Sequence, residues 1–166
     1  MPTFDLLRPT PELRVLVTAG ASGIGAAIAR AFHEAGSQVH VCDIDRSALD
    51  RLVAAAPGIT GSMADASVAA DVDQVFDDLQ GSLGGLDVLV NNVGIAGPTG
   101  PIESIEAAGW ERTIAVNLNS QYHFARRAVP LLKASRSPPT LIGIGSVAGR
   151  LGYAFRTPYA ASKWAI

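Results

Sequence analysis

The sequence predicts an α/β fold built on a doubly wound parallel sheet, and three observations lead to this fold class. Short apolar runs alternate with stretches of helical periodicity along the whole chain. The connections between them are short, so consecutive strands should be joined by right-handed crossovers through helices. Hydrophobic residues make up 48% of the chain and aromatic residues only 6%, a composition typical of a buried parallel sheet of aliphatic side chains.

The first half of the chain is expected to hold three strands, each followed by a helix. Gly36 ends the first helical stretch, and Pro57 with Gly58 closes the second. Asp71 and Asp73 stand near the start of the third. These signals predict strands at 14–18, 38–43 and 59–63, and helices at 23–35, 47–56 and 67–83.

The second half continues the alternation. A fourth strand is expected at 86–91, and a loop rich in Gly and Pro (94–101) follows it. Helical periodicity over 102–133 predicts two helices in succession, before a fifth strand at 140–146. A last helix begins near Tyr159 and is still open when the chain stops. One domain is therefore expected over 13–166, and residues 1–12 are expected to form a loose tail, not a signal peptide.

A glycine-rich turn joins the first strand to its helix. It contains Gly20, Gly23 and Gly25 and leads into an alanine-rich helix. Glycines let the backbone approach phosphates, and the free N–H groups of a helix N-terminus face their negative charge. The second strand ends in Asp43, 18 residues after Gly25, where a carboxylate can accept hydrogen bonds from an adenosine ribose. Asp43 could instead be a plain helix cap. Strand, turn, helix, strand and acid together predict a dinucleotide-binding unit.

A tyrosine and a lysine stand four residues apart near the end of the chain. On a helix this spacing places Tyr159 and Lys163 on one face. A nearby ammonium stabilises a phenolate and lowers the phenol pKa, which makes tyrosine usable as a proton donor and acceptor near neutral pH. Ser146 lies thirteen residues before Tyr159, at the expected end of the fifth strand. These three residues form the candidate catalytic set.

Together these residues resemble the short-chain dehydrogenase/reductase family. The family's Thr-Gly-x-x-x-Gly-x-Gly pattern falls on Thr18, Ala19, Gly23 and Gly25. Its Asn-Asn-x-Gly pattern falls on Asn91, Asn92, Val93 and Gly94. Its helix asparagine falls on Asn117, and its Ser and Tyr-x-x-x-Lys set falls on Ser146, Tyr159 and Lys163. The resemblance covers the chain from about Leu13 to Ile166 and implies a Rossmann fold with strand order 3-2-1-4-5.

The resemblance implies an oxidoreductase that interconverts a secondary alcohol and a ketone by hydride transfer. Tyr159 would be the general acid and base, Lys163 would also bond the nicotinamide ribose, and Ser146 would hold the substrate oxygen. Asn117 would organise its helix and a proton-relaying water. The implied cofactor contacts are Thr18, Gly20, Ser22, Gly23, Ile24, Gly25, Asp43, Asp65, Asn91, Val93, Gly94, Tyr159 and Lys163.

NAD is the expected cofactor. Asp43 would repel the 2′-phosphate of NADP. Relatives that use NADP commonly carry a basic residue at the positions of Ser22 or Ile44, and neither is basic here. Asp65 matches the family acid that faces adenine, although its reading as a helix N-cap is nearly as good. The alternative function is a dinucleotide-binding regulatory protein without turnover, or an inactive fragment.

Two departures from the family pattern stand out. Ala19 replaces the first glycine, and we expect the turn to tolerate it because Gly20 beside it takes up the flexibility. Family members also continue past the Tyr–Lys helix through further strands, so we expect the 166 residues to belong to a longer protein whose C-terminal strands are missing here.

Composition limits the partners. The net charge is -2 without a run of Lys or Arg, which argues against nucleic acid and anionic membranes. The three histidines form no ligand set with Cys42 or a carboxylate, so no metal is expected, and Cys42 itself is expected to be an inert buried thiol. The expected protein is cytoplasmic, binds a small alcohol or ketone, and forms a homo-oligomer, a dimer or homotetramer, in its full-length form.

Overall fold

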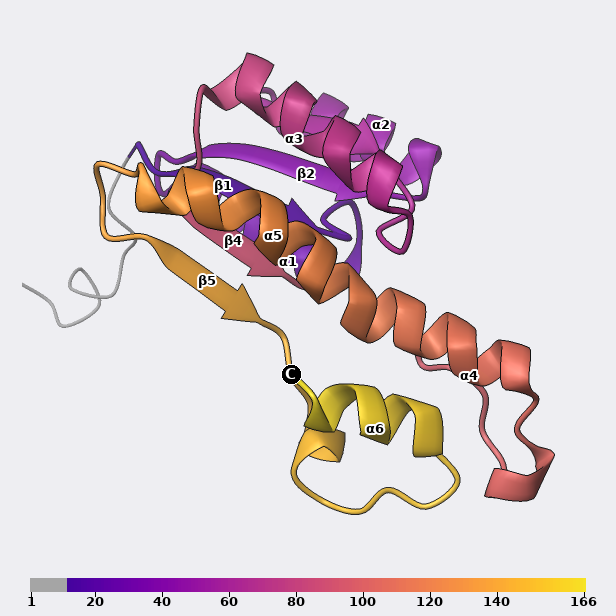
Figure 1. Cartoon of the computed structure of the whole chain (residues 1–166). Helices are drawn as coiled ribbons and strands as arrows, with labels where there is room; N and C mark the ends of the chain where they lie inside the picture. The colour runs from indigo at the N-terminus through magenta and orange to yellow at the C-terminus, as the bar shows by residue number, and fades with distance from the viewer. Residues whose placement is uncertain (1–11) are drawn as a thin grey trace, which may run out of the picture.

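The computed structural model describes residues 12–166, which form a five-stranded parallel sheet between two layers of helices (Figure 1). The strands lie in the order β3-β2-β1-β4-β5. This is the predicted Rossmann fold with the predicted strand order. The strands are β1 (Arg14–Thr18), β2 (Gln38–Asp43), β3 (Ile59–Met63), β4 (Val88–Asn91) and β5 (Thr140–Gly143).

The helices follow the strands in turn. They are α1 (Gly23–Glu34), α2 (Arg46–Ala55), α3 (Ala69–Leu83), α4 (Ala107–Ile114), α5 (Ser120–Lys133) and α6 (Thr157–Trp164), with the 3₁₀ turns η2 (Ile102–Ser104) and η4 (Val147–Gly149) and the π-helical turn η3 (Ala115–Asn119). Helices α1 and α2 cover one face of the sheet and α3 and α5 the other. Helix α6 lies beside α4, beyond the carboxyl end of β5 (Figure 1).

The alternation of side chains along β1 feeds two separate cores. Val15 and Val17 point to the α1 and α2 side, and Leu16 points to the α3 and α5 side. All three are fully buried. A strand buried on both faces needs an unbroken apolar run, and this is why the sequence pattern located the strand correctly.

Several boundaries differ from the predictions. Helix α1 ends at Glu34, not at 35, α2 runs over Arg46–Ala55 in place of 47–56, and α6 begins at Thr157, before Tyr159. Strand β4 begins at Val88, not at 86, and α3 begins at Ala69, not at 67. Strand β5 ends at Gly143, not at 146, because the chain leaves the sheet there toward α6. The two successive helices expected over 102–133 are present as α4 and α5, but α4 begins only at Ala107, after the 3₁₀ turn η2, and the π-helical turn η3 joins it directly to α5.

The tail expected over 1–12 lies outside the described residues except for Glu12. The Glu12 N–H donates to the Gly36 carbonyl oxygen at 3.0 Å. Within residues 12–166, no helix has the length and apolar character needed to cross a membrane.

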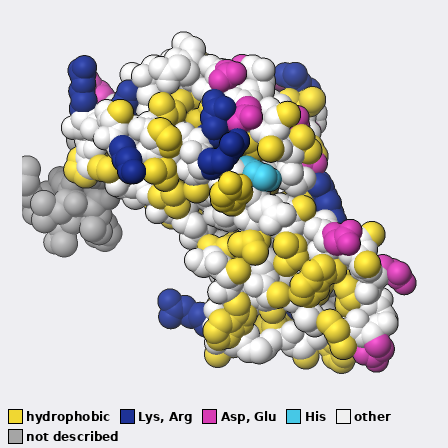
Figure 2. Space-filling view, in the orientation of Figure 1, with side chains coloured by type: hydrophobic (Ala, Val, Ile, Leu, Met, Phe, Trp, Pro, Cys, Tyr) yellow, Lys and Arg dark blue, Asp and Glu magenta, His cyan; other side chains and the backbone are white. Residues whose placement is uncertain are grey.

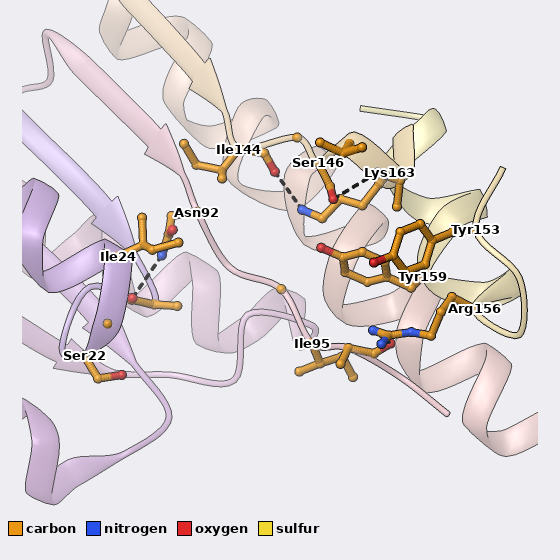
Figure 3. A pocket seen from close by; sticks show the side chains of 18 residues that line it. Ser22, Ile24, Asn92, Ile95, Ile144, Ser146, Tyr153, Arg156, Tyr159 and Lys163 are labelled. Atoms are coloured by element: carbon orange, nitrogen blue, oxygen red, sulfur yellow. Dashed lines mark hydrogen bonds between the residues drawn. The ribbon is translucent and has the colours of Figure 1, made fainter. Parts of the chain in front are cut away.

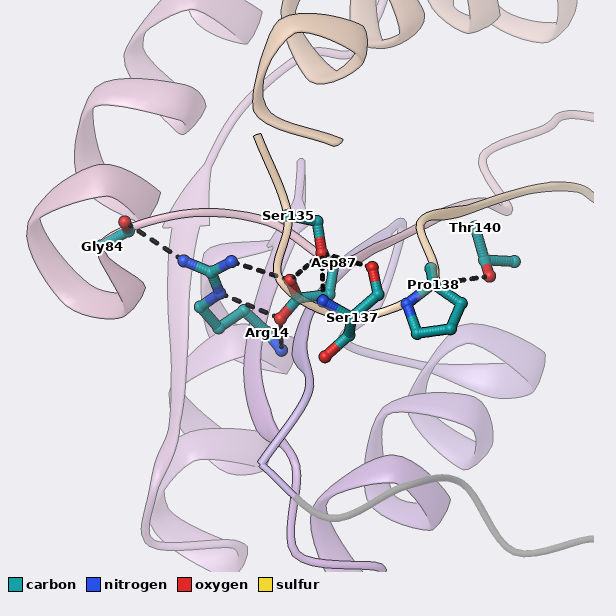
Figure 4. A network of polar contacts seen from close by, with 7 residues as sticks. All are labelled: Arg14, Gly84, Asp87, Ser135, Ser137, Pro138 and Thr140. Carbon is teal, nitrogen blue, oxygen red and sulfur yellow. Dashed lines mark hydrogen bonds and ion pairs between the residues drawn. The ribbon is translucent and has the colours of Figure 1, made fainter. Parts of the chain in front are cut away.

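A buried carboxylate ties the amino ends of β1 and β4 to the loop before β5 (Figure 4). Asp87 accepts hydrogen bonds from the Arg14 backbone N–H (2.9 Å), from Nε (2.9 Å) and from Nη2 (2.7 Å) of the Arg14 side chain, and from Ser135 Oγ (2.5 Å). The bond with the Arg14 guanidinium holds the pKa of Asp87 well below its usual range, although burial acts in the opposite direction. This network lies at the end of the sheet opposite to the glycine turn, so it fixes the frame on which the site is built.

Candidate active site

The glycine turn between β1 and α1 brings backbone N–H groups to the carboxyl end of the sheet. Gly23 has φ +52°, a left-handed conformation that favours glycine. A Cβ on Gly25 would overlap the Ala19 carbonyl oxygen and lie 2.6 Å from Asn92 Nδ2, so only glycine fits there. Ser22 makes no side-chain cap bond, so the first N–H groups of α1 remain available for a ligand. The turn is therefore built to accept an anion.

The expectation that Gly20 takes up the flexibility of the turn is wrong. Ala19 itself adopts the left-handed conformation, with φ +48°, while Gly20 has no positive φ. Gly20 is needed for a different reason: a Cβ there would lie 2.7 Å from the Val41 Cβ and 2.8 Å from the Val17 carbonyl oxygen. The turn tolerates alanine by accepting local strain, and the neighbouring glycine provides space for β2.

Thr18 and Asn92 join the ends of β1 and β4. Thr18 Oγ1 accepts hydrogen bonds from the N–H groups of Asn92 (2.9 Å) and Val93 (3.0 Å). In return, Asn92 Nδ2 donates to the carbonyl oxygens of Thr18 (2.9 Å) and Ala19 (3.1 Å). Thr18 is fully buried by this arrangement. The Thr18 side chain therefore holds the segment after β4 against the start of the glycine turn.

Two adjoining cavities open along the carboxyl ends of the strands. The larger encloses about 710 Å³ and the smaller about 160 Å³, and both are lined by Ala19, Gly94 and Ile95. Figure 3 shows the larger cavity, with Ser22, Ile24 and Asn92 on one side and Ser146, Tyr159 and Lys163 on the other. We call this cavity the cleft.

Most of the predicted site residues line these cavities. Those on the cleft or the smaller cavity are Ser22, Gly23, Ile24, Gly25, Asp43, Asp65, Val93, Gly94, Ser146, Tyr159 and Lys163. Those that line neither are Thr18, Gly20, Asn91 and Asn117. Asn91 is 1% exposed and its side chain faces Gln121 at 3.5 Å, so the first asparagine of the pair lies behind the cleft and the second lines it.

Asp43 and Asp65 lie on the smaller cavity in different settings. Asp43 accepts hydrogen bonds from the backbone N–H groups of Ala21 (3.0 Å) and Asp45 (3.1 Å), which link the end of β2 to the glycine turn. Asp65 accepts bonds from Ser67 and pairs with Arg112 at 3.0 Å. Burial raises the pKa of Asp65, but the Ser67 bonds and the Arg112 guanidinium outweigh it and hold the pKa below its usual value.

Lys163 is anchored by the segment that leaves β5. Its Nζ donates to the Ile144 carbonyl oxygen at 2.7 Å (Figure 3), and burial lowers the pKa of the Lys163 ammonium. Ser146 begins η4, and its Oγ accepts a hydrogen bond from the Ala148 N–H at 3.2 Å. Tyr159 stands one helical turn before Lys163 on α6. The early end of β5 is what releases the Ile144 carbonyl for Lys163.

Asn117 acts on the site from inside the π-helical turn. Its Oδ1 accepts from the Ile95 N–H at 2.7 Å, and its Nδ2 donates to the Ile95 carbonyl oxygen and to Ser162 Oγ, both at 3.0 Å. Ser162 Oγ donates in turn to the Tyr159 carbonyl oxygen at 2.7 Å. A chain of bonds therefore runs from the loop after β4 through Asn117 to the helix that carries Tyr159. Helical spacing predicts that Ser162 lies beside Tyr159, but it does not reveal the contact with Asn117.

Among the described residues no group of His, Cys, Asp and Glu is arranged to hold a metal ion. Cys42 is fully buried, and burial raises the pKa of its thiol to about 12. With this pKa the thiol stays protonated at neutral pH, and a protonated thiol is unreactive.

The family model for short chain dehydrogenases matches residues 14–166. The chain belongs to this family.

Relatives within the short-chain dehydrogenase family agree. A short chain dehydrogenase/reductase of Colletotrichum higginsianum is 37% identical over 89% of this chain and 57% of its own length. The L-fucose dehydrogenase of Oryctolagus cuniculus is 36% identical over 92% of this chain and 53% of its own. The 2-(S)-hydroxypropyl-CoM dehydrogenase 3 of Xanthobacter autotrophicus is 35% identical over 92% and 60%. The chain thus spans a little over half the length of these curated relatives.

A solved structure supports the same assignment. The crystal structure of levodione reductase superposes with a TM-score of 0.88 at 25% identity, over 95% of this chain and 63% of that one. Members of the family usually bind a nicotinamide dinucleotide. The turn fits such a cofactor, because the space that a Cβ on Gly25 would need is taken by the backbone of Ala19, and the free N–H groups at the start of α1 lie on the cleft.

Proposed function

We propose that this chain carries the cofactor-binding and catalytic part of an NAD-dependent oxidoreductase that interconverts a secondary alcohol and a ketone. One observation carries the proposal: Tyr159, Lys163 and Ser146 line the same cleft as the glycine turn (Figure 3). A protein that only binds a dinucleotide needs none of these three side chains at that place.

The N–H groups at the start of α1 would hold the pyrophosphate, and Asp43 would accept hydrogen bonds from the adenosine ribose. Lys163 would bond the nicotinamide ribose. A bound nicotinamide would supply the hydride acceptor in one direction and the donor in the other.

Tyr159 moves the proton. When the alcohol is oxidised, the Tyr159 phenolate takes the hydroxyl proton as the hydride leaves carbon. When the ketone is reduced, the phenol returns that proton to the carbonyl oxygen. The positive charge of Lys163 lies one helical turn from Tyr159, and Ser146 holds the substrate oxygen and stabilises its developing charge. Asn117 and Ser162 position Tyr159 through its own carbonyl.

The proton role is tested with Tyr159→Phe in the full-length protein. This variant should lose turnover, by about 100-fold or more, because the general acid and base is gone. NADH binding, measured by fluorescence titration, should change little because the adenine and pyrophosphate contacts lie elsewhere. A variant that keeps a tenth or more of the wild-type kcat would show that another group transfers the proton.

The preference for NAD is proposed from Asp43. Backbone bonds from Ala21 and Asp45 hold its carboxylate on the smaller cavity, where a 2′-phosphate would meet it. NADP should bind at least about tenfold more weakly than NAD, which corresponds to about 1.4 kcal/mol. Asp43→Ala should reduce the difference between the dissociation constants of NAD and NADP. Equal dissociation constants for the two cofactors in the wild-type protein would contradict the proposal.

We also propose that the full-length protein is a homo-oligomer, a dimer or a tetramer. Large apolar side chains on α5 and α6 support this: Tyr122 is 64% exposed and Trp164 60%. Size-exclusion chromatography with light scattering tests it, and a monomer would refute it.

A further inference from the structure

Arg156 lies on the cleft beside the proposed catalytic tyrosine. It immediately precedes α6, three residues before Tyr159. Its guanidinium carbon stands 5.1 Å from the centroid of the Tyr159 ring, over its face. Its Nη2 donates to the Ala96 carbonyl oxygen at 3.1 Å. In Figure 3 the side chain extends beneath Tyr159 toward Ile95, on the side of the cleft away from Ser22. Sequence reasoning missed this residue, although its helical spacing from Tyr159 was visible.

The charge of Arg156 has no counterion in the part of the chain that the structure describes. The ion pairs of residues 12–166 involve four other arginines, namely Arg14, Arg112, Arg126 and Arg127. Arg156 Nε is buried and has no hydrogen-bond partner. A guanidinium offers five N–H donors and stays charged at any ordinary pH, so most of its binding capacity is unused.

Among the described residues, the charged side chains that line the cleft around Arg156 are all positive. The lining contains Lys163 and Arg156 but neither Asp nor Glu. The positive end of the α6 dipole adds to this potential, since Arg156 occupies the N-cap of that helix. The nearby walls, Ile95, Ala96 and Val147, offer no opposite charge. A cation at a helix N-terminus is unfavourable in itself, and an anion bound there would remove that cost.

The cofactor does not account for this cation. The pyrophosphate would lie against the glycine turn, which Figure 3 places across the cleft from Arg156. The anion that Arg156 suits must therefore enter with the substrate, close to the carbon that reacts at Tyr159. Carboxylates match the planar fork of a guanidinium and accept two parallel hydrogen bonds from it.

We infer that the cleft accepts short-chain hydroxy acids and oxo acids, and that Arg156 binds the substrate carboxylate. The inference rests on the function proposed above. It makes Arg156 a substrate-binding residue that separates charged from uncharged alcohols and ketones.

The test measures NADH oxidation by the full-length protein with two matched pairs of ketones. Acetoacetate and levulinate carry the carboxylate, and methyl acetoacetate and methyl levulinate do not. The wild-type protein should prefer the acids. Arg156→Gln should lower the acid-to-ester ratio of kcat/KM by about 30-fold, the usual loss for a hydrogen-bonded charge pair. The ratio cancels any damage common to both substrates. Arg156→Lys should retain part of the preference.

Arg150→Gln is the matched control. Arg150 belongs to the same connection between β5 and α6, is exposed and does not line the cleft, so its removal should leave the ratio unchanged. A second readout is independent of turnover. Butyrate should raise the melting temperature of the wild-type NADH complex but not that of Arg156→Gln, and butyramide should raise neither.

Two results would overturn the inference: a wild-type preference for the esters, or an unchanged acid-to-ester ratio in Arg156→Gln, whether or not both kinds of substrate are slowed. Equal slowing of acids and esters would mean that Arg156 acts on Tyr159 and does not bind the substrate carboxylate. Turnover of the esters alone would sink the inference and leave the proposed function standing. No turnover of any ketone, with NADH bound, would count against the proposed function, and the butyrate shift would still decide whether Arg156 binds carboxylates.

Discussion

Acid should destabilise the fold through one buried histidine, His40 on β2. This side chain is 2% exposed. Its Nε2 lies 2.9 Å from Ser62 Oγ and its Nδ1 2.7 Å from Thr60 Oγ1. Ser62 uses its own hydroxyl proton to bond Asp78 at 2.5 Å, so it must accept from Nε2, and the neutral ring carries its proton there. Ser82 Oγ approaches Nδ1 at 3.4 Å from α3.

The magnitude follows from the difference between the folded and unfolded states. Burial lowers the pKa of His40 from 6.5 to about 4, although the charge of Asp78 opposes the shift. Because the folded pKa is depressed, the unfolded chain binds the proton first. Stability is then complete above pH 6.5 and is lost as the pH falls toward 4. At pH 4.5 the loss should be about 2–3 kcal/mol, a large share of a typical folding free energy.

The assay is urea unfolding of the wild-type protein and of His40→Gln at pH 7.5 and pH 4.5. The free energy of unfolding should fall between these values by about 2–3 kcal/mol more in the wild type than in the variant. Carboxylates that titrate in the same range contribute to both proteins and cancel in the comparison. If both proteins lose the same free energy, His40 does not carry the acid sensitivity, and the argument from its burial fails.

Two further predictions concern stability. Ala19→Gly should raise the free energy of unfolding by about 1 kcal/mol and the melting temperature by about 2–4 °C, because glycine relieves the left-handed strain at φ +48°; a lower melting temperature would contradict this. Asp87→Asn should cost about 2–3 kcal/mol, since it weakens the paired bonds to Arg14 in a buried place, while Asp50→Asn on the exposed face of α2 should stay within about 0.5 kcal/mol. Urea unfolding of the two aspartate variants side by side checks it, and equal stabilities would refute the role given to the network.

The parts of the fold that the sequence predicted are those with local causes. The first three strands match their predicted bounds because each is an apolar run between turn residues, and Gly36 and Pro57 fall where helices end. The strand order needed the family resemblance, because periodicity alone does not say which strands are neighbours.

The errors have causes that lie away from the residue concerned. Helical periodicity does not register the extra residue of a π-helical turn, so it predicted two successive helices without showing that η3 joins them over Ala115–Asn119. Strand β5 ends at Gly143, where the chain turns toward α6, and the Ile144 carbonyl just beyond it bonds Lys163, nineteen residues later. The positive φ of Ala19 and the close packing of Gly20 against Val41 are features of the folded turn that the sequence does not display.

The site residues also fall into those that local sequence spacing predicts and those that depend on distant partners. Residue types at fixed spacing identified Tyr159, Lys163 and Ser146, since their pattern is local. Arg156 and Ser162 belong to the same helix region, yet their importance comes from partners across the molecule, namely Ala96 and Asn117. Sequence spacing cannot report an unpaired charge, because pairing is decided in three dimensions.

Hydrogen bonds explain how the sheet positions Tyr159, which lies on α6 beyond the carboxyl end of β5. The Asn117 side chain accepts a hydrogen bond from the Ile95 N–H and donates one to the Ile95 carbonyl, just beyond β4. It also donates to Ser162 Oγ, which donates in turn to the carbonyl of Tyr159. Lys163 is fixed separately, by the Ile144 carbonyl at the end of β5. The two proposed catalytic residues are therefore held by segments that follow two neighbouring strands, β4 and β5. Backbone pairing sets the register of these strands. Because Tyr159 and Lys163 stand one turn apart on α6, a slide of β5 against β4 would strain these anchoring hydrogen bonds and shift the whole helix relative to the cleft.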